Sequence, residues 1–185
     1  MSRGHEIAIF YPGSITLGNR IVLRGYASRY SRVDVYARVI LAVASLGADW
    51  PVHALVRVDG EPTRLTAKPD CYEGRGERSV VYSILMAIKR GEHECIAAER
   101  EHYERFLHRK SKSHAIIRLS EEGTDISGLS PEGSILWVMG AHKEPEEEVE
   151  NIIRRYASQE VSIGPLSYLS SQTAMYIVWR LSWRD

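Results

Sequence analysis

Apolar and polar positions in the first half of the chain predict two strands and two helices in alternation. The segment HEIAIFY (5–11) alternates polar and apolar residues, as half-buried strands do. From residue 32 apolar side chains recur at helical spacing until Gly47, and VHALVRV (52–58) predicts the next strand. A second helix is predicted over 77–90. Residues 12–31 follow neither period and predict a loop.

The rest of the chain predicts three short strands and three further helices. The strands are HAIIRL (114–119), SILWVMG (134–140) and EVSIG (160–164). A helix within 144–156 is expected to hold Pro145 in its first turn. The charged stretch 93–110 predicts an exposed helix. The last helix of the chain is expected to bury Ala174, Ile177, Val178 and Leu181.

Strands that alternate with helices predict one α/β domain, 1–185, with a mainly parallel sheet flanked by helices. In such sheets ligands bind where loops leave the carboxyl ends of the strands. The loops are 120–125, 140–145 and 163–172, and each holds one glycine: Gly123, Gly140 and Gly164. These glycines either make tight turns or let the backbone approach a ligand closely. We therefore predict a shared pocket for a small polar ligand.

Composition narrows the class of protein. Hydrophobic residues make up 44% and charged residues 26% of the chain, which is ordinary for a globular protein. No apolar run approaches the roughly 18 residues that cross a membrane, and the first residues lack the apolar region of a signal peptide. Cys71 and Cys95 form no CxxC motif. We expect no disulfide framework, no zinc ribbon and a cytoplasmic location.

A formal net charge of +0 leaves room only for a local nucleic-acid patch. Such a patch is predicted within 12–31, next to Arg32, where cations and aromatic rings occur together: Arg20, Arg24, Arg29, Tyr26 and Tyr30. This combination favours single-stranded or splayed RNA, although a solvated charged face is the alternative. No metal is expected, because the spacing of the cluster His93, Cys95, His102 and His108 fits no known ligand set. The sequence holds no Walker loop, GxSxG or HExxH motif.

Five segments occur in the order and approximate spacing of one known family: SRVDVYARV (31–39), GERSVV (76–81), EEGTDI (121–126), VMGAHKE (138–144) and VSIGPLSYLSSQTA (161–174). In them the chain resembles the archaeal tRNA (pseudouridine-54 N1)-methyltransferase family. This family is a branch of the SPOUT superfamily, whose C-terminal half is a deep trefoil knot. The resemblance is weakest over 92–112. It implies an RNA-facing part, about 1–112, and a knotted cofactor-binding part, about 113–185.

The resemblance implies S-adenosylmethionine as the cofactor, tRNA as the substrate, and a homodimer in which Arg32 and Asp34 face the partner's cofactor. Residues expected to contact the cofactor, largely through backbone groups, are Leu119, Gly140, Val161, Ser162, Ile163, Gly164, Pro165, Leu166 and Thr173. Arg32, Asp34, Arg38, Glu77 and Arg78 match family positions that face the RNA and the reacting base. The family usually reads Gly-Asp-His where this chain has Gly140-Ala141-His142, and often Cys where it has Thr173. A role assigned to that Asp therefore does not transfer.

The expected reaction needs a proton acceptor, since N1 of pseudouridine carries a proton. A carboxylate such as Asp34 could take it, and Arg32 could stabilise negative charge on a uracil carbonyl. An ordinary surface pair of Asp34 with Arg38 explains the same spacing. Two other functions stay open. They are methylation of pseudouridine in ribosomal RNA, and RNA binding without catalysis, which Ala141 favours.

Overall fold

The computed structural model describes residues 4–129 and 133–182, and within them the strands form one sheet of order β4-β5-β3-β2-β1-β7-β6-β8. The strands are β1 (His5–Ile15), β2 (Val52–Val58), β3 (Glu61–Ala67), β4 (Glu92–His93), β5 (Ile96–Arg100), β6 (Ala115–Asp125), β7 (Ile135–Gly140) and β8 (Gln159–Ser162). The neighbours from β2 to β8 pair in parallel, whereas β3, β5 and β4 form an antiparallel edge. The predicted α/β class with a mainly parallel sheet is confirmed.

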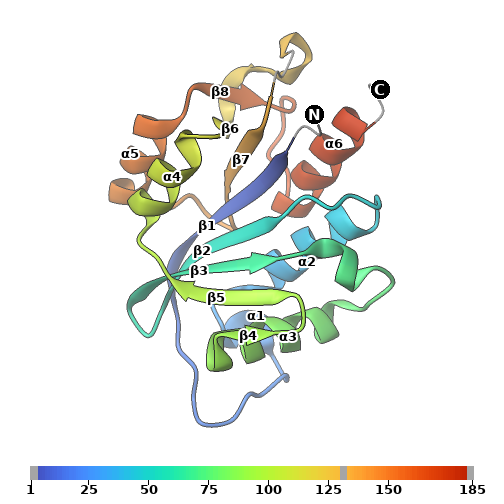
Figure 1. The fold of residues 1–185 in the computed structure, drawn as a ribbon, viewed down its shortest axis with the longest axis vertical. Helices are drawn as coiled ribbons and strands as arrows, with labels where there is room; N and C mark the ends of the chain where they lie inside the picture. The colour runs from blue at the N-terminus through green and yellow to red at the C-terminus, as the bar shows by residue number, and fades with distance from the viewer. Residues whose placement is uncertain (1–3, 130–132, 183–185) are drawn as a thin grey trace.

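Helices cover both faces of the sheet (Figure 1). They are α1 (Tyr26–Arg29), α2 (Val33–Ala44), α3 (Glu77–Arg90), α4 (Tyr103–Ser111), α5 (Glu147–Tyr156) and α6 (Ser170–Ser182), with short 3-10 turns at Pro69–Tyr72 and Ile126–Gly128. One core joins α2, α3 and α6 to the sheet through Ile7 and Ile9, and the other joins α4 and α5 through Ala8 and Phe10. Alternate residues of β1 thus pack into opposite layers, because successive side chains of a strand point to opposite faces of the sheet.

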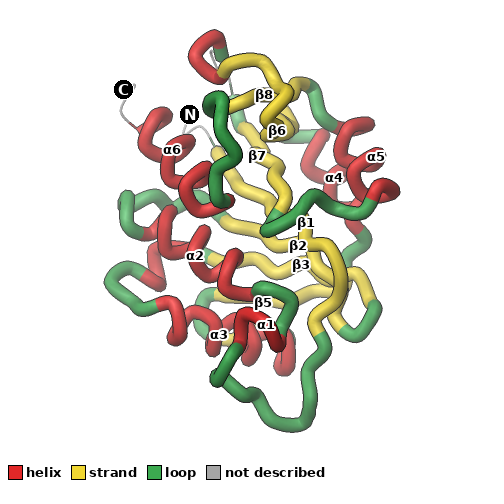
Figure 2. The backbone as a smooth tube through the Cα atoms, turned by 180° about the vertical axis from the view of Figure 1, so that it is seen from behind, coloured by secondary structure: helices red, strands yellow, loops and turns green. Residues whose placement is uncertain are grey.

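The route of the chain after β8 brings the C-terminal helix close to the N-terminal half. Strand β8 lies at the edge of the sheet, beside β6. The chain then returns across the sheet, and α6 packs against α2 on the face shown in Figure 2. The buried stripe predicted for α6 is confirmed, because Ala174, Ile177 and Val178 have no exposed surface and Leu181 packs against the same core.

Three local predictions were wrong. Within the predicted exposed helix 93–110, residues 96–100 instead form β5, which pairs with β3. The part that is helical, α4, buries Tyr103, Phe106 and Leu107. The segment 12–31 is not loop throughout, because β1 continues to Ile15 after an irregularity and α1 follows. Pro145 precedes α5, whose N-cap is Glu146. The errors at β5 and at the end of β1 come from pairing with distant strands, which local periodicity does not record.

The two cysteines form a disulfide, Cys71 to Cys95, although we expected none. They are 24 residues apart in sequence, with a Cα–Cα distance of 6.3 Å. The bridge joins the 3-10 turn at 69–72 to the start of β5, an antiparallel neighbour that the sequence did not predict. Among the described residues, no helix is long and apolar enough to cross a membrane.

Candidate active site

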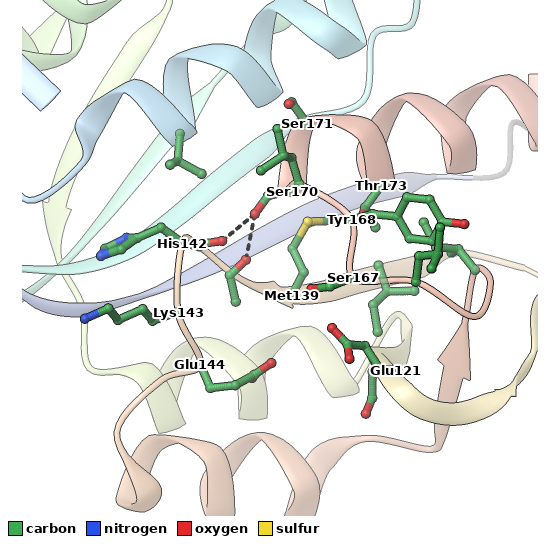
Figure 3. A pocket seen from close by; sticks show the side chains of 18 of the residues that line it. Glu121, Met139, His142, Lys143, Glu144, Ser167, Tyr168, Ser170, Ser171 and Thr173 are labelled. Carbon is green, nitrogen blue, oxygen red and sulfur yellow. Dashed lines mark hydrogen bonds between the residues drawn. The ribbon is translucent and has the colours of Figure 1, made fainter.

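A cavity of about 520 Å³ opens beside the carboxyl ends of β7 and β8 and the middle of β6 (Figure 3). Residues 119–121 of β6, the turn after β7 and the segment after β8 form one side of it, and the first turn of α6 forms another. Arg32, Val35 and Arg38, from the start of α2, complete the wall. The predicted shared pocket is therefore present, but residues 120–125, which we expected to form a loop, belong to β6. The cavity also includes residues of the N-terminal half.

Nearly all the residues that we expected to contact a cofactor line this cavity: Leu119, Gly140, Val161, Ser162, Ile163, Gly164, Leu166 and Thr173. Pro165 is not among the lining residues. Other lining residues were not predicted as cofactor contacts, and they include Glu121, Met139, His142, Lys143 and Glu144. The sequence did contain a signal for His142, Lys143 and Glu144, because these charged or titratable residues directly follow a buried strand whose end was expected to form the pocket.

The turn after β7 requires glycine at position 140. A Cβ there would lie 3.0 Å from the backbone oxygen of Lys143, which is tighter than ordinary contact. The Ser170 hydroxyl is within hydrogen-bond distance of the backbone oxygens of Gly140, at 3.0 Å, and Ala141, at 2.6 Å. The Ala141 amide donates to the backbone oxygen of Phe10 at 3.2 Å. The backbone of the turn is thus held by β1 and by the start of α6.

An unusual backbone turn aims Arg32 at the cavity. Ser31 and Arg32 both have positive φ, 47° and 60°, a conformation that costs energy for residues other than glycine. The Ser31 hydroxyl donates to the Ser14 carbonyl at 2.6 Å. The buried Tyr11 hydroxyl donates to the Arg32 carbonyl at 3.3 Å and accepts from the Tyr36 amide at 2.7 Å. These bonds hold the N-terminus of α2 in the strained form.

Two arginines share the buried carboxylate of Asp34. Arg32 donates to both oxygens, at 3.0 and 2.9 Å, and Arg38 lies 3.2 Å from the second oxygen. Both guanidinium side chains are 42% exposed, whereas the Asp34 side chain is 0% exposed. Burial alone would raise the pKa of Asp34, but the hydrogen bonds from Arg32 and the charges of both arginines hold it below its usual value. The sequence indicated either Arg32 or Arg38 as the partner of Asp34, and in the structure Asp34 interacts with both.

A second carboxylate supports Arg38 from the other side. Glu77, at the start of α3, accepts from the Arg38 Nε at 2.8 Å and from the Tyr26 hydroxyl. Tyr30, which we expected to stack on RNA bases, is buried, with 3% exposure, and its hydroxyl accepts from the Val22 amide. That stacking prediction was wrong, because the ring belongs to the core beneath α1.

Charges divide the cavity into two sides. In Figure 3, His142 and Lys143 lie on the α2 side, whereas Glu121 and Glu144 lie toward α5. Burial and the neighbouring carboxylate of Glu150 raise the pKa of Glu144. Burial and the cations Arg32 and Lys143 lower the pKa of His142, against the opposing effect of Asp34. One side of the cavity therefore suits a cationic ligand, and the other suits electron-rich groups.

Four of the arginines that we expected to bind RNA lie outside the cavity on the surface: Arg20, Arg24, Arg29 and Arg78. In the part of the chain that the structure describes, none of them forms an ion pair with a carboxylate. Arg38, the fifth, lines the cavity. The described residues hold no cluster of metal-ligating side chains either, since Cys95 is bridged and His102 caps α4.

A model of SAM-dependent RNA methyltransferases matches residues 12–182, nearly the whole chain. The chain belongs to this family, and its cofactor is S-adenosylmethionine. The resemblance noted in the sequence is thereby confirmed at the level of the family.

Individual relatives place the chain more closely. It is 25% identical over 178 residues to the tRNA (pseudouridine(54)-N(1))-methyltransferase of Methanopyrus kandleri, covering 90% of this chain and 87% of that protein. Its fold is similar to that of Archaeoglobus fulgidus Nep1 bound to S-adenosylhomocysteine, with a TM-score of 0.59 at 14% identity, over 97% of this chain and 95% of that one. It is also similar to ribosomal RNA small subunit methyltransferase E of Neisseria gonorrhoeae bound to S-adenosyl methionine. There the TM-score is 0.52 at 12% identity, over 96% of this chain and 65% of that one.

Proposed function

We propose that this protein methylates N1 of pseudouridine 54 in the T-loop of tRNA. The observation that carries the proposal is one cavity that joins residues 119–121 of β6 and the segments after β7 and β8 to Arg32 and Arg38. The Methanopyrus kandleri relative supports the choice of base and position. We further propose that the chain acts in the cytoplasm as a single domain, with an RNA-facing part at about 1–112 and a cofactor-binding part at about 113–185.

The lining residues named above, from Leu119 to Thr173, are proposed to hold the cofactor, with Pro165 shaping the turn between them. A volume of about 520 Å³ lies within the usual range for small-molecule sites. A Cβ at Gly140 would press on the backbone oxygen of Lys143, so the glycine preserves the tight turn that lines the cavity. The cofactor supplies a methyl group on a positively charged sulfur, and Glu121 and Glu144 suit that charge.

Arg32 is proposed to face the reacting uracil and to stabilise negative charge on its carbonyl. Its guanidinium is partly exposed on the wall of the cavity, while Asp34 lies behind it and fixes its direction. Arg38 holds the same carboxylate from the other side. This pair therefore acts as a unit, in which Asp34 works through Arg32.

The surface arginines are proposed to bind the tRNA backbone. Arg20, Arg24 and Arg29 precede α2, Arg78 begins α3, and their cations are not neutralised by carboxylates in the described residues. Phosphate contacts of this kind supply sequence-independent affinity and orient the substrate. The base then enters the cavity beside Arg32 and Arg38.

A C-terminal knot and a homodimer are proposed as well. The return of the chain from β8 across the sheet to α6 supports the knot, which an experimental backbone trace through residues 115–182 would test. Leu166, Leu169 and Trp179 are 65%, 63% and 51% exposed, which supports an interface on α6 and the loop before it. A further tryptophan near the C-terminus of the sequence, Trp183, lies outside the described residues. Sedimentation at micromolar concentration should give a dimer, and a monomer would oppose the proposal.

The resemblance implied that the partner chain completes each site, but Arg32 lines the cavity of its own chain. Mixing Gly140→Val and Asp34→Ala subunits distinguishes the two arrangements. If each chain builds its own site, both sites of a mixed dimer carry one defect and activity stays absent. Restored activity would show that the partner supplies Arg32 and Asp34.

The direct test is methylation of defined RNAs by the purified protein. A tRNA transcript carrying pseudouridine at position 54 should yield N1-methylpseudouridine, measured by mass spectrometry of its nucleosides. The matched transcript with uridine at position 54 should gain no methyl group. Activity on ribosomal RNA alone would reassign the substrate. Inactivity on both RNAs would favour the RNA-binding module that Ala141 allows.

A further inference from the structure

The proposed reaction leaves one participant unassigned, because the proton on N1 of pseudouridine needs an acceptor. Asp34 is badly placed for this role. Its side chain has no exposed surface, and both oxygens already accept hydrogen bonds from Arg32. Arg38 occupies the same carboxylate. A substrate base that approached Asp34 would have to displace a guanidinium first, so an acceptor on the surface of the cavity is better placed.

Among the described titratable side chains that line the cavity, few offer a free lone pair beside Arg32. Arg38 and Lys143 are cations, and cations have no acceptor. Glu121 and Glu144 lie toward α5, on the side that we assign to the cofactor (Figure 3). Tyr168 lies near the C-terminal loop, away from the turn after β7. The remaining group is His142.

Resting on the proposed function, we infer that His142 accepts the N1 proton during methyl transfer. The residue follows the held turn at Gly140 and Ala141, so its backbone has a fixed position. Its ring lies on the α2 side of the cavity, where it senses the charges of Arg32 and Asp34 (Figure 3). Neither ring nitrogen has a hydrogen-bond partner within residues 4–129 and 133–182. A nitrogen is therefore free to face the substrate.

The charge state of His142 fits this role. Burial, Arg32 and Lys143 together hold its pKa below the usual value, and Asp34 only partly offsets them. The imidazole is then neutral near pH 7 and able to take a proton. In the step, the N1–H bond breaks and the proton moves to the ring nitrogen of His142. The electron pair left on N1 forms the new bond to the methyl carbon. The electron pair of the carbon–sulfur bond that breaks remains on sulfur.

The test begins with His142→Asn, which keeps a polar side chain of similar size but takes no proton. We expect single-turnover methylation of the pseudouridine-54 transcript to fall about 100-fold or more, with cofactor affinity by calorimetry unchanged. The wild-type rate should rise with pH up to the pKa of His142 and then level off, and the variant should lose this rise. His108→Asn, the same change on the exposed face of α4, is the matched control.

Two measurements separate proton transfer from a structural role. Imidazole added to His142→Ala should restore part of the rate in proportion to its concentration. In the wild-type protein, NMR titration of the His142 ring, assigned by its absence in the variant, should give a midpoint below about 6.5. An unchanged rate and pH profile in His142→Asn, or a loss of cofactor binding, would overturn the assignment. Wild-type protein that does not methylate the transcript would instead overturn the proposed function on which it rests.

Discussion

Adding one methyl group at Gly123 should separate two backbones that build the cofactor side of the cavity. Val161 of β8 pairs with both Leu119 and Thr124 of β6, so residues 120–123 arch over it. A Cβ at Gly123 would lie only 2.5 Å from the backbone nitrogen and carbonyl carbon of Val161. Ordinary contact begins near 3.4 Å, so the two segments must move apart by about 1 Å. Neither contact partner is a flexible side chain that could turn aside.

The expected cost follows from that overlap. Forcing an extra methyl group into a packed site typically costs about 1–3 kcal/mol, and rigid backbone partners place Gly123→Ala near the upper end. Val161 and its neighbours line the cavity, so an error of about 1 Å should also lower the rate of methyl transfer about 100-fold. Urea denaturation followed by circular dichroism measures the first effect, and single-turnover methylation measures the second.

Gly128→Ala provides the matched control for this prediction. It lies five residues further along, and nothing stands within 4 Å of the Cβ it would add. The free energy of unfolding of the Gly128→Ala variant should stay within about 0.5 kcal/mol of the wild-type value. If Gly123→Ala unfolded at the same urea concentration as the wild type and methylated RNA at the wild-type rate, the close passage of residues 120–123 over Val161 would be refuted.

Two further predictions concern RNA binding and stability in acid. Changing Arg20, Arg24 and Arg29 together to Ala should weaken tRNA binding and lower its salt slope by about one unit per lost phosphate contact, in filter binding at several salt concentrations. An unchanged slope would place the RNA surface elsewhere. Burial opposes ionisation of Glu6, but its hydrogen bond to His53, at 2.7 Å, and the ammonium of Lys110 hold its pKa at about 2. The unfolded chain therefore binds this proton first, and about 2–3 kcal/mol of stability should be lost as pH falls from 4.5 to 2. In Glu6→Gln, denaturant titrations should lack that loss, and an identical loss would contradict the role of Glu6.

The sequence predicted the layout of the site because that layout follows local rules. Strand and helix periods located β6, β7 and β8, and parallel pairing brings their carboxyl ends to one edge. These two rules grouped the segments 120–125, 140–145 and 163–172, although residues 120–125 continue β6 instead of forming a loop. The resemblance to a family then supplied the ligand and the roles of Arg32 and Asp34, which periodicity alone does not give.

The features that the sequence missed depend on contacts between distant segments. The charged strand β5 is stabilised by pairing with β3, and the bridge from Cys71 to Cys95 exists only because that pairing brings the two cysteines together. The burial of Tyr30 reflects packing beneath α1 rather than its own neighbours in sequence. The position of Arg32 against its own chain's cavity likewise follows from the backbone turn at Ser31 and Arg32.

A crystal structure with S-adenosylhomocysteine, the demethylated cofactor, tests the central claim most directly. The account predicts the ligand in the cavity between the turn at Gly140 and the segment 161–166, with Arg32 and His142 on the open side beyond its sulfur. A ligand bound elsewhere, or bound with its sulfur turned away from Arg32, would contradict the account.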